Sequence, residues 1–562
     1  MSAKLKIETA LYALLLLLLY WVQYQHSSAL YADADNYMHA LRTIDFMLHP
    51  SMFEHYFTQT DYPFGEISHW TKLMDILMAV CALPFLLFMN LKAAVFAGGF
   101  ILTPLCALGV LYFLQKIGAA GMNTRSRFAM YLILWMQAQF AMCFKVNRPD
   151  HHAVIILLAV WLLWVLFEYM RQGRKNLIWQ AAVVCSAALW LAVEGVFMYA
   201  CTIMFLYGGY LFWQFGYRDL IRFTTGYAAG CLFWWLLNPP LQGYFYADNG
   251  RISVLYVVLA LIVAAVVYIG GFIRHKVIQF GFLGTAAVAC LSGLWFGGYM
   301  HSPLPPEITA AFTDRISEMQ GGANIYCMTY PVLGMLALCL LWYAEKQRKQ
   351  VFMLLCFAIP YTVLSAYAIR FMPYAVLYAA VAVALWLSRQ QYGRFKFAVC
   401  VLFLGLAEII SFVIFSLYYR DLTKPVEKNL SVNVRFFQQY RFPQGAVVSD
   451  IFLTPYVLWY AEHPTVASPY HRNVEGIVDN HRIFMSNDMN EVAALIKKHQ
   501  VGSIVLPLDM DKTYYVDPAK NTDKLYGMML AGHQYPEWLK ENNAARLWNY
   551  VVLEIIPEKL PD

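Results

Sequence analysis

Mostly apolar runs of about 20 residues recur along this chain, and they constrain its fold more than any other feature. A helix of that length crosses the hydrocarbon core of a bilayer. Hydrophobic residues make up 60% of the chain and charged residues only 14%, far fewer charges than soluble domains carry. The sequence therefore predicts a polytopic α-helical membrane protein. We count about thirteen spans, at 8–25, 95–115, 126–145, 152–170, 177–195, 198–214, 223–238, 252–272, 277–297, 326–344, 351–368, 371–388 and 395–418.

One further apolar run, 73–90, is not counted as a span because Asp75 interrupts it. Without it, the loops that follow every second span carry clusters of Lys and Arg, beginning with Lys116, Arg125 and Arg127. The opposite loops are poor in basic residues. The positive-inside rule then predicts a cytoplasmic N-terminus and an extracytoplasmic C-terminus in the cell inner membrane. The run at 73–90 is expected to be an interfacial or re-entrant helix.

Three regions then lie on the predicted outer side: the loop 26–94, the loop 298–325 and the tail that begins near residue 420. The tail is less apolar than the rest of the chain. It contains three predicted strands and one predicted amphipathic helix, at 446–448, 503–506, 551–556 and 491–499. We therefore expect a transmembrane domain over 1–419, with the two outer loops forming its site, and a soluble α/β domain over 420–562.

Two carboxylates follow the first span in the segment YADADNYMHALR. Asp33 and Asp35 are separated by one residue, and His39 lies on the same helical face as Asp35. Carboxylates at this spacing can hold a hard divalent cation, which prefers oxygen ligands. The alternative is that they cap the following helix in solvent.

A second polar group, NRPDHH at 147–152, lies between the third and fourth spans. Asp150 and His152 alternate as Asp33 and Asp35 do, and an imidazole ligand shifts the metal preference towards Mn, Fe or Zn. The alternative is a helix cap at Asp150 with interfacial histidines. Two such pairs on one membrane face favour a metal site.

Three more charged residues lie on the predicted outer side. Glu318, in RISEMQGG, could orient a substrate amide or hydroxyl, or be a solvated loop residue. Arg370, in AIRFMPY, suits a phosphate group because its guanidinium donates a pair of parallel hydrogen bonds, although snorkelling to lipid headgroups is the alternative. Glu194, at the end of the fifth span, is a costly charge without a partner visible in the sequence.

The order of these motifs resembles the catalytic subunit of oligosaccharyltransferase, within the GT-C glycosyltransferases. Asp35 matches the first motif aspartate of that family, and Asp150 with His152 matches its second motif. Ser317-Glu318 resembles the Ser-Glu of the flexible outer loop. Arg370-Phe371 resembles the pair whose arginine holds the lipid phosphate. His69, in EISHWTK, is a looser match on the long first loop.

The C-terminal domain departs from this family. Its members read the acceptor sequon with a Trp-Trp-Asp-Tyr-Gly motif, but this chain has VVSDIFLTPYVLWY at 447–460 instead. Asp450 is present without the tryptophans. A different polar cluster follows at Tyr470, His471 and Arg472. The resemblance therefore does not imply recognition of an Asn-x-Ser/Thr acceptor.

The resemblance implies a metal-dependent inverting glycosyltransferase that takes a sugar or oligosaccharide from a polyprenyl-(di)phosphate carrier. The acceptor is a protein, lipid or glycan at the outer membrane face. An enzyme that glycosylates a lipid or polysaccharide, or a flippase for lipid-linked sugars, remains an alternative, and no nucleic acid is expected. The implied cofactor is Mn²⁺ or Mg²⁺. The implied site residues are Asp35 and Glu318 for catalysis, Asp35, Asp150, His152 and Asp33 for the metal, Arg370 and Arg148 for phosphate, and His39, His69, Glu194, Tyr470, His471 and Arg472 for substrate.

Overall fold

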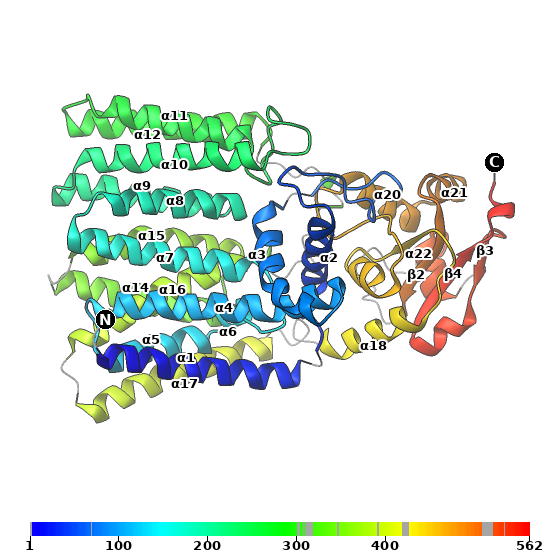
Figure 1. Ribbon diagram of the computed structural model, residues 1–562, viewed down its shortest axis with the longest axis horizontal. Coiled ribbons are helices and arrows are strands. Elements are labelled where there is room, and N and C mark those ends of the chain that lie inside the picture. Colours follow the sequence, from blue (N-terminus) through cyan, green and yellow to red (C-terminus); the bar gives the residue numbers. More distant parts are fainter. Residues whose placement is uncertain are drawn as a thin grey trace.

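The computed structural model describes residues 3–561 except 28, 69, 300–303, 307, 310–318, 345–347, 391–392, 419–425, 509–520 and 533. Most of the described chain is a bundle of nearly parallel helices, and a smaller mixed region packs against one end of it (Figure 1). We call this end of the bundle the domain end. The N-terminus lies at the opposite end.

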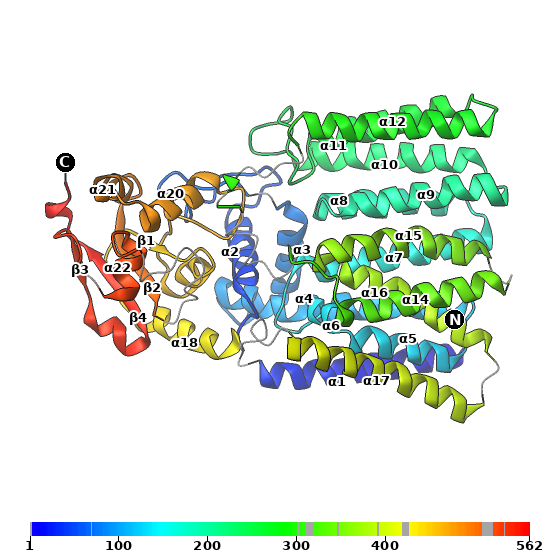
Figure 2. The same cartoon turned by 180° about the vertical axis from the view of Figure 1, so that it is seen from behind.

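Ten helices of the described residues are long and apolar enough to cross a membrane. Two shorter apolar helices and one broken pair occupy the remaining predicted spans, so every one of the predicted runs is helical. The prediction of a polytopic helical membrane protein is confirmed. Figure 2 shows the bundle from behind. The ten helices are α1 (Ala3–His26), α4 (Leu91–Ala119), α7 (His151–Gln172), α9 (Gly195–Trp213), α10 (Tyr217–Leu237), α12 (Lys276–Phe296), α14 (Ile325–Tyr343), α15 (Arg348–Tyr367), α16 (Met372–Arg389) and α17 (Arg394–Tyr418); the two shorter helices are α8 (Asn176–Leu191) and α11 (Val254–Gly270).

The broken pair is α5 (Thr124–Met136) and α6 (Ala138–Cys143), where sequence analysis predicted one span over 126–145. Gln137, between them, has extended backbone, and its side-chain oxygen accepts a hydrogen bond from the N–H of Gln139 at 2.9 Å. Gln137 therefore ends one helix and caps the next. A short polar side chain that offers the backbone an alternative partner is a common cause of such breaks.

The predicted interfacial run is confirmed as a structure distinct from the spans. It forms α3 (Lys72–Ala82) and a 3-10 turn (Leu83–Leu87), and together with α2 (Ala34–Leu48) it lies across the domain end of the bundle (Figure 1). A Cβ atom at Gly98 of α4 would lie 2.7 Å from the backbone nitrogen of Ala82. Glycine at this position therefore lets the backbones of α3 and α4 approach closely.

The C-terminal region contains a four-stranded sheet in the order β1-β2-β4-β3. β1 (Ala446–Ser449) and β2 (Val501–Pro507) are parallel, whereas β4 (Tyr550–Ile555) is antiparallel to both β2 and β3 (Leu539–Glu541). Three of these strands were predicted and β3 was not, because its three residues are too few to show alternation. The helices are α18 (Val426–Gln439), α19 (Thr454–Tyr456), α20 (Val474–Met485), α21 (Met489–Lys498) and α22 (Leu525–Ala531); short 3-10 or π-helical turns lie at Ile369–Phe371, Val457–Ala461, Asn543–Trp548 and Pro557–Lys559.

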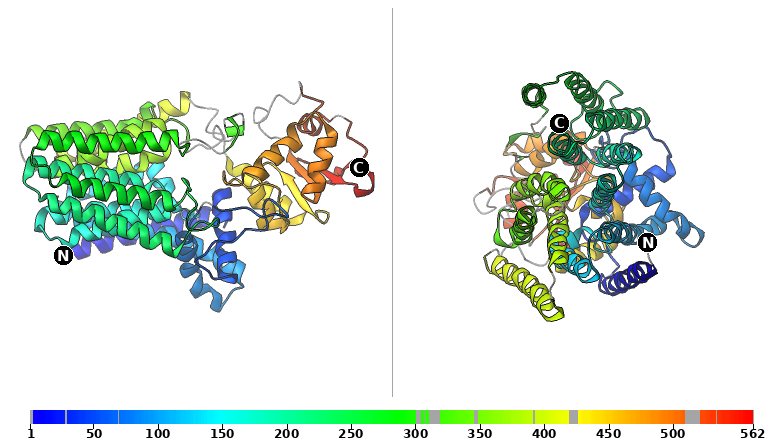
Figure 3. Two further views of the ribbon diagram at one scale, coloured as in Figure 1. Left: turned by 90° about the horizontal axis from the view of Figure 1, so that it is seen from above. Right: turned by 90° about the vertical axis from the view of Figure 1, so that its left-hand side faces the viewer.

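Helix α2 lies between the bundle and the C-terminal region (Figure 3). The hydroxyl groups of Tyr37 on α2 and Tyr460 are 2.8 Å apart. The loop before α3 also joins the C-terminal region, since the N–H of Tyr62 donates to the carbonyl of Thr465 at 3.2 Å. Each of these contacts holds the segment 26–94 against the C-terminal region, so α2 has a defined position between two packed bodies.

Candidate functional site

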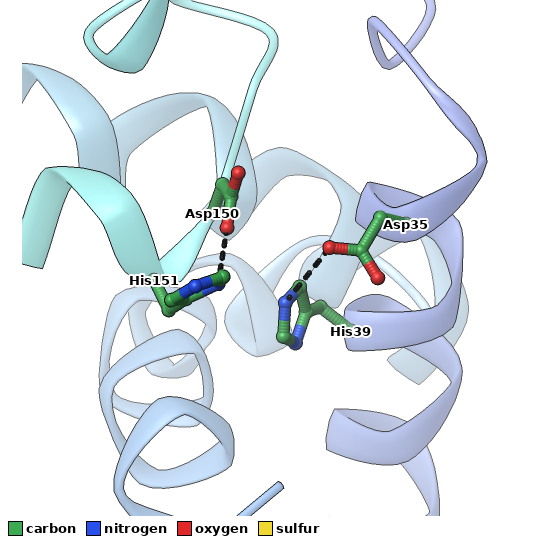
Figure 4. A group of neighbouring side chains, drawn as sticks. All are labelled: Asp35, His39, Asp150 and His151. Atoms are coloured by element: carbon green, nitrogen blue, oxygen red, sulfur yellow. Dashed lines mark ion pairs between the residues drawn. The ribbon is translucent and has the colours of Figure 1, made fainter. Parts of the chain in front are cut away.

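Four side chains meet where α2 and the start of α7 face each other at the domain end of the bundle (Figure 4). Asp35, His39, Asp150 and His151 each offer one ligand atom, and these atoms all lie within 4.8 Å of one another. Asp35 is partly exposed and the other three are buried. We call these residues the group of four.

Helix α2 supplies Asp35 and His39. The side chain of Asp33 caps the helix by accepting the N–H of Asn36 at 3.2 Å, so α2 begins at the right place to present both residues. Residues four apart lie one above the other on a helix. His39 Nε2 is accordingly 3.6 Å from the Asp35 carboxylate.

Asp150 caps α7, and His151 is its first residue. The carboxylate of Asp150 lies 2.5 Å from Nδ1 of His151, and both side chains are almost fully buried. The N-terminus of a helix carries partial positive charge, which stabilises the Asp150 carboxylate there. The Asp-His element predicted from the sequence therefore reaches the site with Asp150 and His151.

His39 supplies the strongest sign that the group of four fits a metal ion. Its ring is fully buried, and neither ring nitrogen makes a hydrogen bond to any described residue. Burial lowers the pKa of His39 to about 3, although the nearby Asp150 carboxylate opposes this shift. Buried polar atoms without a partner are rare. Two carboxylates and two buried imidazoles form a donor set that suits a divalent transition metal.

The structure places the other predicted metal residues beside the group of four. His152 is buried, and its ring packs on the ring of His151 with centroids 4.2 Å apart. Asp33 lies 3.3 Å from Nε of Arg148, whose Nη2 is 3.1 Å from Asp150. The alternation with Asp150 favoured His152 as the ligand, whereas the ligand atom that lies close to the other three belongs to His151. Successive residues at a helix start project in different directions. His39, predicted as a substrate contact, is one of the four.

An aromatic ring closes one side of the group. Trp70 lies with its ring centroid 4.2 Å from that of His151 and 5.3 Å from that of His39. The carbonyl of Trp70 accepts a hydrogen bond from Arg42, at 3.3 Å, and the same guanidinium nitrogen is 2.8 Å from the Asp75 carboxylate. Arg42 therefore ties α2, the segment before α3 and α3 itself into one unit.

A second buried ion-pair network adjoins this unit and was not predicted from the sequence. Glu54 lies 3.2 Å from Nζ of Lys72 and 3.0 Å from Nη1 of Arg251, and all three side chains are less than 5% exposed. Asn238 donates to the same carboxylate at 3.1 Å. These residues lie far apart in the chain, so nothing in the sequence distinguishes them from charged residues exposed to solvent. The network holds the segment before α3 against the loop between α10 and α11.

Arg370 and Glu194, each predicted as a costly lone charge, form an ion pair with each other. Their pairing could not be predicted from the sequence, because 176 residues and several helices separate the two positions. Nη1 of Arg370 also lies 3.4 Å from the sulfur of Met319. Burial lowers the pKa of His471 to about 4, and the charges of Arg472 and Arg370 act in the same direction. His471 of the C-terminal region therefore lies within electrostatic reach of Arg370.

The polar cluster at 468–472, which follows the segment 447–460, also reaches the site. Tyr470 is buried, with its ring 6.4 Å from that of Trp70, edge to face. The hydroxyl of Ser468 donates to Glu66 at 2.5 Å, and Arg472 pairs with Asp248 of the loop between α10 and α11. The polar cluster predicted from the sequence is thus held by the loop before α3 on one side and by the loop between α10 and α11 on the other.

Two predicted site residues, His69 and Glu318, lie outside the described residues, together with Ser317. Their roles stay predictions.

The sequence matches no established family profile, and no curated protein matches it in sequence. Solved structures do match the fold. The oligosaccharyltransferase AglB of Archaeoglobus fulgidus, in complex with an inhibitory peptide and a dolichol-phosphate, superposes with a TM-score of 0.64 at 14% identity. The match covers 88% of this chain and 68% of that one. The chain has an oligosaccharyltransferase fold.

Two further structures of the A. fulgidus enzyme agree with this assignment. One, tethered with an acceptor peptide that contains the NVT sequon, has a TM-score of 0.58 at 16% identity and covers 91% of this chain and 69% of its own. The other, a complex with Zn and sulfate, has a TM-score of 0.56 at 15% identity and covers 89% and 67%. At this identity the oligosaccharyltransferase fold is established, and the activity has to be argued from the site.

Proposed function

We propose that this chain is a metal-dependent inverting glycosyltransferase, which moves a sugar or oligosaccharide from a polyprenyl-(di)phosphate carrier to an acceptor at the outer membrane face. The group of four carries the proposal, because it joins carboxylates and imidazoles at the domain end of the bundle. The oligosaccharyltransferase fold supports it. Structures of the A. fulgidus enzyme in complex with a dolichol-phosphate and with Zn and sulfate are consistent with a carrier phosphate and a divalent ion.

The proposed metal is a divalent cation, Mn²⁺ or Mg²⁺. Asp35, Asp150, His39 and His151 would hold it, with Asp33 and His152 beside them. Imidazole ligands favour Mn²⁺ over Mg²⁺. When bound, the cation supplies positive charge that neutralises the phosphate leaving group.

The remaining proposed roles belong to charged side chains around this group. Arg148, against Asp150, and Arg370, near His471, would donate hydrogen bonds to the carrier phosphate. Asp35 is the partly exposed member of the group of four, so it is the carboxylate able to orient the acceptor and take its proton. Glu318 would share this role. A single displacement at the anomeric carbon inverts its configuration.

The C-terminal segment supports an acceptor other than the Asn-x-Ser/Thr sequon, whether protein, lipid or glycan. Tyr470 packs near Trp70, which adjoins the group of four, and Arg472 pairs with Asp248. We assign Tyr470, His471 and Arg472 to substrate binding. Glu194 would act by orienting Arg370. The alternation of basic loops supports a cytoplasmic N-terminus and an extracytoplasmic region from about residue 420, in the cell inner membrane.

The test uses the full-length protein in membranes that contain its native lipid-linked sugars. Asp150→Asn keeps the size of the side chain and removes its charge. Loss of sugar transfer, measured by mass spectrometry of extracted carrier lipids and glycosylated acceptors, is the expected result, and a chelator should have the same effect. Asp488→Asn, an exposed acid of the C-terminal region, is the matched control. A flippase would instead move lipid-linked sugar across the membrane without transferring it, whatever the chelator.

A further inference from the structure

A buried carboxylate lies inside the membrane-spanning bundle, away from the group of four. Glu408 of α17 is 3% exposed, and neither of its carboxylate oxygens makes a hydrogen bond to any described residue. No ion pair joins it to a basic side chain in the described part of the chain. An ionisable side chain within a membrane span is expensive unless it binds something.

The surroundings of Glu408 are polar on the side of α14. One turn before it, the carbonyl of Leu404 accepts a hydrogen bond from Tyr330 at 3.4 Å. One turn after it, the hydroxyl groups of Ser411 and Thr329 are 3.0 Å apart. Residues 404, 408 and 411 share one face of a helix. Glu408 therefore faces α14 between these two contacts.

The break between α5 and α6 lies beside the part of α14 and α17 that surrounds Glu408. We call the place where these helices meet the junction. A Cβ atom at Gly405 would lie 3.6 Å from Met136, the last residue of α5. The N–H of Ala138 donates to the hydroxyl of Tyr326 at 3.1 Å, and the amide nitrogen of Gln139 is 3.8 Å from the sulfur of Cys327. The broken span thus meets α14 and α17 beside Glu408.

Two further polar atoms at this junction are buried without a partner among the described residues: Nε2 of Gln137 and Oε1 of Gln139. With the two oxygens of Glu408, the junction offers three hydrogen-bond acceptors and one donor. Broken helices in membranes commonly line binding sites for polar groups, because the break frees polar atoms within the bundle. The junction has the features of a ligand site that the proposed transfer reaction does not use.

We propose that this junction binds the headgroup of an aminophospholipid from the surrounding leaflet. A primary ammonium group donates three hydrogen bonds and carries the charge that the Glu408 carboxylate needs. The lipid phosphate can accept from the amide of Gln137. The depth of the junction along the bundle suits a lipid headgroup, because Tyr326 and Cys327 are close to the domain end of α14, which begins at Ile325.

The surroundings of the junction favour a lipid over a soluble amine. Helix α17 presents large apolar side chains on its outer surface, including Leu402, Phe403 and Ile410, which are 56–65% exposed. Such a surface in a membrane span is covered by lipid chains. Gln139, at the edge of the junction, is only partly buried.

The experiment measures lipid binding rather than transfer, so its outcome is independent of the proposed enzyme activity. The purified full-length protein in detergent is titrated with phosphatidylethanolamine and, separately, with phosphatidylcholine of the same chains, and bound lipid is counted by native mass spectrometry. Phosphatidylcholine has no N–H on its ammonium group. The wild-type chain should prefer phosphatidylethanolamine by about tenfold in apparent affinity.

Glu408→Gln should abolish this preference, and Gln139→Leu should reduce it. Glu462→Gln, an exposed acid paired with Lys92, is the matched control and should retain it. Equal binding of the two lipids by the wild-type chain, or an undiminished preference in Glu408→Gln, overturns the proposal. Because each variant is compared between two lipids, a change in its overall stability does not affect the conclusion.

Discussion

Breaking the ion pair between Arg42 and Asp75 should destabilise the protein and loosen the group of four. The two groups are 2.8 Å apart, and their side chains are 5% and 0% exposed. At that distance, with an effective dielectric constant of about 20, the attraction is about 6 kcal/mol before the cost of desolvation is subtracted. Removing one member of a buried pair typically costs about 3–5 kcal/mol, because the other charge stays buried.

We therefore expect Arg42→Met and Asp75→Leu each to lower the free energy of unfolding by about 3 kcal/mol or more. The double variant leaves no charge behind, so its loss should be far smaller than the sum of the two single losses. Unfolding is followed by tryptophan fluorescence in detergent micelles. The exposed pair of Arg546 and Glu541 is the control, for which Arg546→Met should cost less than about 1 kcal/mol.

A second measurement links this ion pair to the site. Arg42 also holds the carbonyl of Trp70, whose ring packs on His39 and His151. The single variants should bind Mn²⁺ at least about tenfold more weakly, as measured by calorimetry, because groups that orient metal ligands typically contribute that much. Additive losses of stability in the double variant, or unchanged Mn²⁺ affinity in both single variants, would refute the reasoning.

Three further predictions concern single residues. His151→Ala should weaken Mn²⁺ binding, measured by calorimetry, by at least about tenfold, and His152→Ala should weaken it by less, because only His151 belongs to the group of four. The opposite order of the two losses would indicate that His152 is the ligand. Burial raises the pKa of Glu66 from 4.5 to about 7, although the hydrogen bond from Ser468 opposes the shift. The protonated side chain therefore stabilises the fold fully below pH 4.5, and this contribution is lost as the pH rises to about 7. The loss is roughly 3 kcal/mol, and Glu66→Gln should flatten the fall in unfolding free energy over this range; an unchanged pH profile contradicts it. Gly98→Ala should lower the free energy of unfolding by about 1–3 kcal/mol, because the added Cβ meets the backbone of α3, and wild-type stability would show that α3 can move aside.

The spans could be predicted because lipid imposes one rule on every helix that crosses it, and the charge pattern counted the crossings independently. Asp75 illustrates the value of that count. Its charge indicated that 73–90 is not a span, and the structure shows a short helix in which Asp75 is paired with Arg42. The sequence could not show that partner, which lies in a separate helix.

The site could be predicted only as far as its motifs. Asp35 and Asp150 were identified because each lies in a short polar segment beside an apolar run. The choice between His151 and His152 depends on the direction of each side chain at a helix start, which spacing alone does not specify. The pairing of Glu194 with Arg370, and the network of Glu54, Lys72 and Arg251, require knowledge of which helices are neighbours.

The position of α2 between the bundle and the C-terminal region has a consequence for the order in which the protein is made. Tyr37 and its partner Tyr460 are 423 residues apart in the chain. At 5–20 residues per second, a ribosome needs roughly 20–80 seconds to pass from one to the other. During that time α2 lacks the layer that the C-terminal region supplies, although Asp35 and His39 are already outside the ribosome. All four residues of the group are made by residue 151, but the region that covers α2 is made only later, so a chain that stops before Tyr460 lacks the layer that holds α2 in place.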